Sequence, residues 1–309
     1  MLSTISPAAQ QFVNSINNVQ TQMAVAEQQI STGLKVSQPS DAPDQISPIL
    51  QLHSAIQQNQ DIQNGLNSAT TTLQASDTAL SSAINLLQSA SVIASQATGT
   101  SQTADTRTIL AQNVQTIMEQ MVAASSTTMG GNYIFSGDQP GTPLYQLDLA
   151  APTGVDRLQV SNATSLVQGT GGAQYSTSLS SNVIFDPRNA DDTPSSNNTF
   201  AALNGLRVAL LANDTAGITN SVAALNSAST YMNSQLAFYG QAEDRVSSDL
   251  NQAQSASVQL QTQLSSMTDA DMTQAMTALT QGTTQLQAAL SARARIPNTS
   301  LFDVLPLTT

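Results

Sequence analysis

The first 33 residues carry apolar side chains at alternating intervals of four and three positions. This spacing is the narrow stripe of a coiled-coil helix, whereas a helix in a globular core has a wider apolar face. No charged residue precedes Glu27. Because burying a charge is costly, the neutral flanks indicate a helix surrounded by protein, with an ordinary core helix as the alternative. The stripe consists of Ile5, Ala9, Phe12, Ile16, Val19, Met23, Ala26 and Ile30.

A break follows this helix. Gly33 predicts its end, because the residue after a helix is often a glycine in the left-handed conformation. Pro39 and Pro43 prevent the helix from resuming at once, so we expect Gly33, Pro39 and Pro43 to form a hinge. Asp41 is expected to cap the next helix, with Asp44 three positions later in capping-box spacing.

Two long stripes of similar length come next, in residues 44–97 and 218–267. In the first, leucine recurs every seven residues at positions 66, 73, 80 and 87, with small residues three positions after each. A helix of about 50 residues is about 80 Å long. Two equal helices on either side of an insertion predict an antiparallel rod. Shorter helices are expected at 103–129, from 199 onward, and up to about 295. The stripe of the last helix is Met272, Met276, Leu279, Thr283, Leu286 and Leu290.

Residues 130–198 differ in character, because Gly, Pro, Asp, Asn and Ser become frequent. Short β-like runs stand in this stretch, namely "NYIFSG", "DRLQVSN", "QYSTSLS" and "NVIFD". We expect a small antiparallel β module that a short linker can replace. The predicted fold class is mainly α: a long antiparallel helical rod with an inserted small β module and terminal coiled-coil helices. The expected segments are an assembly helix at 1–40, rod helices at 41–129, the module at 130–198, rod helices at 199–267, and an assembly helix and tail at 268–309.

Composition removes several classes of partner. Only 9% of the residues are charged, and the net charge is −12. With so few basic residues we expect no binding of nucleic acid and no docking on anionic membranes. No stretch approaches the roughly 18 apolar residues of a membrane span, so no membrane insertion is expected. The start of the chain lacks a basic region and an apolar core, so it does not predict a Sec signal. It fits a cytosolic protein or one exported without a cleavable signal.

Candidate chemistry is sparse. Cysteine is absent, and His53 is the only histidine, with Asp61 two turns further on and no nucleophile at helical spacing. The acidic run from Asp186 to Asp192 lacks calcium-loop spacing, and a surface loop is the expected reading. We expect no enzyme activity, cofactor or metal. Tyr133, Phe135 and Tyr145 are expected to form the small core of the module, and Asp269 and Asp271 to cap the last helix.

Two motifs resemble the flagellin superfamily. "QQISTGLKVSQPSDAPDQISPILQL" at 28–52 is similar to the N-terminal region of flagellins and hook-associated proteins, and "TSLFDVL" at 299–305 is similar to their C-terminal end. The resemblance covers about 1–140 and 199–305. "QPSDAP" and "GGNYIFSGDQPGTPLY" are more similar to the hook-associated members, and the "FNG" motif that flagellins tend to carry is missing.

The resemblance implies a structural role in the bacterial flagellum, as a junction subunit between hook and filament; the filament subunit itself is the alternative. It also implies export through the flagellar type III channel, an export chaperone in the cytosol, and an extracellular ring or helical assembly with other copies, hook-associated proteins and flagellin. A secreted adhesin whose β module binds a ligand is an alternative of another class.

The terminal stripes are then the expected assembly surface, and we expect their contacts to form only between subunits, with both ends unfolded in the monomer. The expected assembly residues are Ile5, Phe12, Ile16, Val19, Met23, Ile30, Met272, Met276, Leu279, Leu286, Leu290, Leu301 and Phe302.

Overall fold

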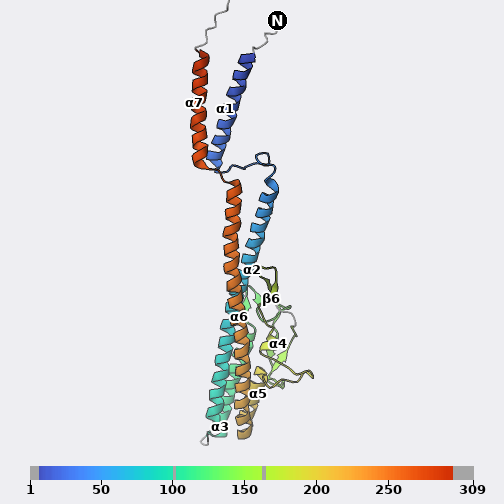
Figure 1. Cartoon of the computed structure of the whole chain (residues 1–309). Helices are drawn as coiled ribbons and strands as arrows, with labels where there is room; N and C mark the ends of the chain where they lie inside the picture. The colour runs from blue at the N-terminus through green and yellow to red at the C-terminus, as the bar shows by residue number, and fades with distance from the viewer. Residues whose placement is uncertain (1–6, 100–101, 162–164, 295–309) are drawn as a thin grey trace, which may run out of the picture. The chain divides into compact units, whose positions relative to one another are not determined.

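The computed structural model describes residues 7–99, 102–161 and 165–294. The chain divides into two compact units (Figure 1). Unit 1 joins residues 1–57 with 258–309, and unit 2 comprises residues 58–257. Two long helices, α2 (Ile46–Ala97) and α6 (Thr215–Thr268), contribute residues to both units.

Unit 2 is built around the leucine stripe of α2. Leu66, Leu73, Leu80 and Leu87 are at most 1% exposed, and the small residues three positions after each are buried too. Burying one leucine contributes about 1.5–3 kcal/mol, so this row is a major source of stability. The stripe predicted from the sequence is confirmed.

Helices α2 and α6 run antiparallel in unit 2. The Gln63 side chain donates to the Ala253 carbonyl at 3.2 Å. Toward the other end, residues 87–96 of α2 line a common groove with residues 225–229 of α6. An early part of α2 therefore meets a late part of α6, as two equal helices around an insertion predict. Helix α3 (Ala104–Ser125) packs against the short helix α5 (Thr199–Leu211).

A buried arginine that the sequence did not single out joins the end of α2 to the turn between α5 and α6 in unit 2. Arg107 is 6% exposed, and its Nε donates to the Ala97 carbonyl at 3.1 Å, at the C-terminus of α2. Its Nη1 donates to Asn213 Oδ1, and Asn213 has a φ of +52° between α5 and α6. A cation at the negative end of a helix dipole is stabilised there, so Arg107 ties the C-terminus of α2 and the α5–α6 turn to α3.

Among the described residues, three separate antiparallel pairs of short strands lie in the inserted module and at its start. The paired strands are β1 (Thr128–Met129) with β2 (Asn132–Tyr133), β3 (Tyr145–Leu147) with β4 (Val155–Arg157), and β5 (Leu166–Gln168) with β6 (Gln174–Ser176). The expectation of a small antiparallel module is confirmed.

One run in the module was predicted wrongly. "NVIFD" was expected to be a strand, but residues 181–184 form the helical turn α4 (Ser181–Ile184). Ile184 and its neighbour Phe185 are both fully buried, while Val183 is 40% exposed. Successive residues of a strand point to opposite faces, so a strand cannot direct both residues to one core. A helical turn places Ser181, Ile184 and Phe185 on one side.

The aromatic residues of the module do not form a core of their own, contrary to the expectation from the sequence. The Phe135 ring lies 5.6 Å from Phe185 and 6.3 Å from Tyr239 of α6. The Tyr145 ring lies 5.0 Å from Phe200 of α5. Module and helices share one hydrophobic cluster, so the module is part of the core of unit 2 and not a replaceable appendage. Tyr133 lies at the edge, only half-buried.

The β5–β6 pair is fastened to α6 by a second aromatic contact. The Tyr175 hydroxyl donates to Asp249 Oδ2 at 2.8 Å, and the Arg245 guanidinium lies 3.7 Å from the centre of the Tyr175 ring. Burial, together with the hydrogen bond to Asp249, raises the pKa of Tyr175 to about 12. The phenol therefore stays protonated and keeps donating at neutral pH.

Candidate assembly surface and its joint

In unit 1, helix α1 (Pro7–Thr32) packs against helix α7 (Met272–Ala294). Ala26 is 3% exposed and Ala275 is 2% exposed. Gly282 lets the backbones approach closely, since a Cβ at that position would lie 2.5 Å from Met23 Cγ. Within one chain, small residues therefore hold α1 and α7 together.

This pairing corrects the expectation that the terminal helices make contacts only between subunits. It also changes which face of α7 is covered. The covered stripe runs through the buried Ala275 and Gly282 and the half-buried Leu279 and Leu286. Of the predicted stripe, Leu279, Thr283 and Leu286 are half-buried, whereas Met272, Met276 and Leu290 are exposed. The half-buried members of the predicted assembly set are Phe12, Ile16, Val19, Met23, Ile30, Leu279 and Leu286.

The other predicted positions of α7 lie on an uncovered face. Met272 is 38% exposed, Met276 is 54% exposed and Leu290 is 56% exposed. On α1, Val13 and Val25 are also uncovered, at 45% and 48%. The two valines lie about 120° apart around α1, so we call only Met272, Met276 and Leu290 of α7 the open face. Ile5, Leu301 and Phe302 lie outside the described residues.

The open face has few charges around it. Glu27 is the only charged residue of α1, and Arg293 is the only one of α7. The Arg293 guanidinium carbon lies 6.0 Å from the centre of the Phe12 ring. A water-exposed helix pair usually carries ionised side chains beside its seam, so this surface is suited to burial by further protein.

The chain enters and leaves the α1–α7 pair through two cross-linked segments. Gly33 ends α1 with a φ of +73°, as predicted, and its carbonyl accepts from Ala270 N at 2.8 Å. The Lys35 amide donates to the Thr268 carbonyl at 2.8 Å, and its ammonium donates to the Ser266 carbonyl at 2.9 Å. We call residues 33–45 and 266–271 the joint.

These bonds tie the hinge expected at Gly33, Pro39 and Pro43 to the break at the end of α6. Movement at one segment therefore requires adjustment in the other. The hinge role of these three residues remains a prediction. The sequence had not assigned this role to Lys35, the only lysine of the chain.

Asp41 was expected to cap α2, and this is wrong. Its carboxylate accepts hydrogen bonds from the backbone amides of Ser37 at 2.9 Å and Gln38 at 2.8 Å, which precede it. These bonds lower the pKa of Asp41. Helix α2 begins only at Ile46, so Asp41 stabilises a turn within the joint. Asp271 does cap α7, since it accepts from the amides of Thr273 and Gln274.

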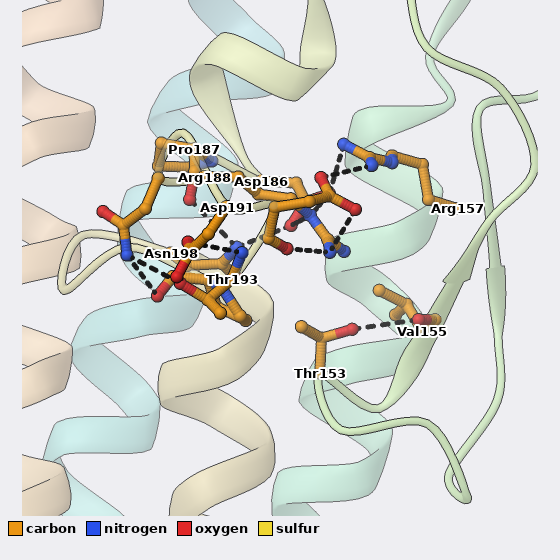
Figure 2. Close-up of polar contacts among 12 residues, drawn as sticks. Thr153, Val155, Arg157, Asp186, Pro187, Arg188, Asp191, Thr193 and Asn198 are labelled. Carbon is orange, nitrogen blue, oxygen red and sulfur yellow. Dashed lines mark hydrogen bonds and ion pairs between the residues drawn. The ribbon is translucent and has the colours of Figure 1, made fainter.

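The run from Asp186 to Asp192 is not a plain acidic surface loop. Asp186 is 1% exposed and accepts hydrogen bonds from Arg188 Nε at 3.0 Å and Asn198 Nδ2 at 2.5 Å. Arg157 of β4 lies 3.8 Å from Asp186 and donates to Asp192 at 2.7 Å (Figure 2). The two arginines neutralise Asp186 and Asp192, so the cluster holds β4 and this loop together.

Among the described residues, the remaining candidates form no metal-binding group and no membrane-spanning helix. His53 is exposed near the start of α2. In the described part of the chain, no three His, Asp or Glu side chains are grouped so that they could hold a metal ion. None of the described helices has the length and apolarity needed to cross a membrane.

Comparison with known sequences decides the family. Residues 4–139 match the bacterial flagellin N-terminal helical region, and residues 222–305 match the bacterial flagellin C-terminal helical region. The two matches account for most of the chain and contain both halves of the α1–α7 pair. The chain belongs to the flagellin superfamily.

Within this superfamily, two curated relatives are named flagellar hook-associated protein 3, one from Escherichia coli and one from Salmonella typhimurium. Each is 28% identical to this chain over 205 residues, which is 65% of this chain. The chain spans 64% of the length of these relatives. A solved structure of a flagellar hook-associated protein from Vibrio parahaemolyticus has a similar fold, with a TM-score of 0.65 at 15% identity. The structural match covers 74% of this chain and 100% of the Vibrio parahaemolyticus chain.

Proposed function

We propose that this chain is a structural subunit of the bacterial flagellum, placed at the junction between hook and filament. The observation that carries the proposal is the open face on α7. It is apolar and nearly free of charge, as a helix pair packed among other subunits requires. The similarity to two proteins named flagellar hook-associated protein 3 supports this position in the flagellum.

The partners follow from the same proposal. Further copies of the chain cover the open face in a ring or helical array, and hook-associated proteins and flagellin adjoin that array. The chain reaches the outside of the cell through the flagellar type III apparatus after release from a cytosolic chaperone. The absence of cysteine suits this route, because no disulfide can block passage of the unfolded chain. Residues 1–40 and 268–309 are the assembly segments in this proposal.

A deletion strain examined by electron microscopy tests the function. We expect hooks without filaments, with flagellin released into the medium, and restoration of filaments by the full chain but not by an empty vector. If the chain were the filament subunit instead, the medium of the deletion strain would lack the main flagellar protein. If filaments formed normally without it, the chain would have no junction role, as expected of an adhesin.

A further inference from the structure

Methionine is the residue type of this chain that oxidants attack most readily. The sequence contains nine methionines but neither cysteine nor tryptophan. Peroxides convert the methionine thioether into a sulfoxide, and this reaction requires that the oxidant reach the sulfur atom. The exposed methionines are therefore the positions at which an oxidant in solution modifies the protein first.

The eight methionines of the described chain differ in exposure. Three are fully buried and three are half-buried, whereas Met272 is 38% exposed and Met276 is 54% exposed. Among the described residues, these two thioethers are thus the ones that an oxidant reaches most easily. The fully buried methionines are Met118, Met121 and Met232, and the half-buried ones are Met23, Met129 and Met267.

Both exposed methionines belong to the open face. They are four positions apart on α7, so their side chains are neighbours on the same side of the helix. The residues that separate them along the chain, 273–275, carry no charge. Two of the three residues that define the open face therefore present a sulfur atom that an oxidant can reach.

We propose that Met272 and Met276 are modification sites at which a hydroperoxide blocks assembly of the free subunit; this role rests on the proposed function, in which further copies cover the open face. The sulfur lone pair attacks one peroxide oxygen, the O–O bond breaks and an S–O bond forms. With hydrogen peroxide, the departing hydroxide takes the proton of the transferred oxygen and becomes water. The thioether loses two electrons and the peroxide gains them, so no further reactant is required.

The sulfoxide replaces an apolar group with a polar one. In the free subunit both side chains reach water, so their oxidation leaves the α1–α7 pair intact. In an assembly the sulfoxide oxygen loses its water within an apolar contact, and this desolvation is unfavourable. Subunit affinity should therefore fall at least about tenfold when both residues are oxidised. A covered methionine is shielded from the oxidant, so the modification acts before assembly and not after it.

Peptide mass spectrometry of the full-length monomer during treatment with hydrogen peroxide identifies the sites. We expect the Met276 sulfoxide to form at least about tenfold faster than the Met232 sulfoxide, because Met232 is fully buried. In isolated intact flagella, the Met276 sulfoxide should form at least about tenfold more slowly than in the monomer. Equal rates in either comparison would overturn the proposal.

Sedimentation velocity of the full-length chain at high concentration measures the effect on association. Peroxide treatment should weaken association at least about tenfold without changing the thermal melt, and methionine sulfoxide reductases should restore it. A Met272→Leu/Met276→Leu chain has no sulfur at these positions, so after treatment it should associate as strongly as its own untreated sample. Equal weakening of this chain and the wild type would place the effect at other methionines and overturn the proposal. Undiminished association of a wild type that carries both sulfoxides would overturn it too.

The deletion strain separates this inference from the proposed function. If filaments are lost in that strain but the sulfoxide form associates normally, the junction role stands and the oxidation sites are wrong. If peroxide weakens association through Met272 and Met276 while the deletion strain keeps its filaments, the modification stands and the junction role is wrong.

Discussion

Substitutions at two adjacent positions of α7 can distinguish an effect on assembly from an effect on folding. Ala275 is 2% exposed and faces α1, whereas Met276 is 54% exposed on the open face. The same change to aspartate at each position introduces the same charge into the same helical turn. Ala275→Asp and Met276→Asp are therefore a matched pair that differs mainly in the direction of the side chain.

The expected magnitudes follow from these exposures. Full burial of a methionine side chain contributes about 1.5–3 kcal/mol, so covering the open half of Met276 in an assembly contributes about 1 kcal/mol. An aspartate there loses this contribution and also has to be desolvated at several kcal/mol. Subunit affinity should fall by at least about a hundredfold, since each 1.4 kcal/mol is tenfold. In the monomer, Met276→Asp should change the free energy of unfolding by less than about 1 kcal/mol. Ala275→Asp should destabilise the α1–α7 pair by about 3 kcal/mol or more.

Hydrogen exchange on the purified monomers measures the stability of α1 and α7, and electron microscopy of the complemented deletion strain measures assembly. We expect Met276→Asp to keep normal exchange protection and to form no filaments, while Ala275→Asp loses protection in both helices. Normal filaments with Met276→Asp would refute the role of the open face. Equal loss of protection in the two variants would refute the α1–α7 pairing described above.

Three further changes test single contacts. Burial raises the pKa of Tyr239 to about 12, whereas a tyrosine of the unfolded chain has a pKa of about 10. The protonated Tyr239 therefore contributes its full stabilisation below pH 10, and this contribution is lost as the pH rises toward 12. Thermal melts should therefore show that Tyr239→Phe loses less stability than the wild type over this range, and an equal loss would contradict the assignment. Asp186→Asn leaves two arginines short of a counter-charge and should cost about 3 kcal/mol in chemical denaturation, whereas the exposed control Asp191→Asn should cost less than about 1 kcal/mol. Lys35→Met removes the ammonium that holds the Ser266 carbonyl and should speed amide exchange in the joint about fivefold without changing the melting temperature; unchanged exchange would show that the backbone bonds suffice.

Local periodicity was sufficient to predict the long helices. The leucines at positions 66, 73, 80 and 87 have a seven-residue repeat, and this repeat defines a buried face whatever the partner is. Gly33 likewise predicts a helix end from its own conformational freedom. The sequence also contained the two motifs on which the resemblance to the superfamily rests.

Contacts between distant residues were decided only by the tertiary structure. The buried state of Asp186 depends on Arg157, which lies 29 positions earlier, in strand β4. "NVIFD" has the composition of a strand but becomes helical, because the core needs Ile184 and Phe185 on the same side.

The sequence also could not show which face of α7 packs against α1. Two stripes with 4-3 spacing share Leu279 and Leu286, and hydrophobicity favours the one that contains Met276 over the one that contains Gly282. Packing reverses this choice, because a glycine opposite Met23 brings two helix backbones closer than a large side chain would permit. A periodic pattern records how apolar each position is, whereas the covered face depends on the shape of the partner.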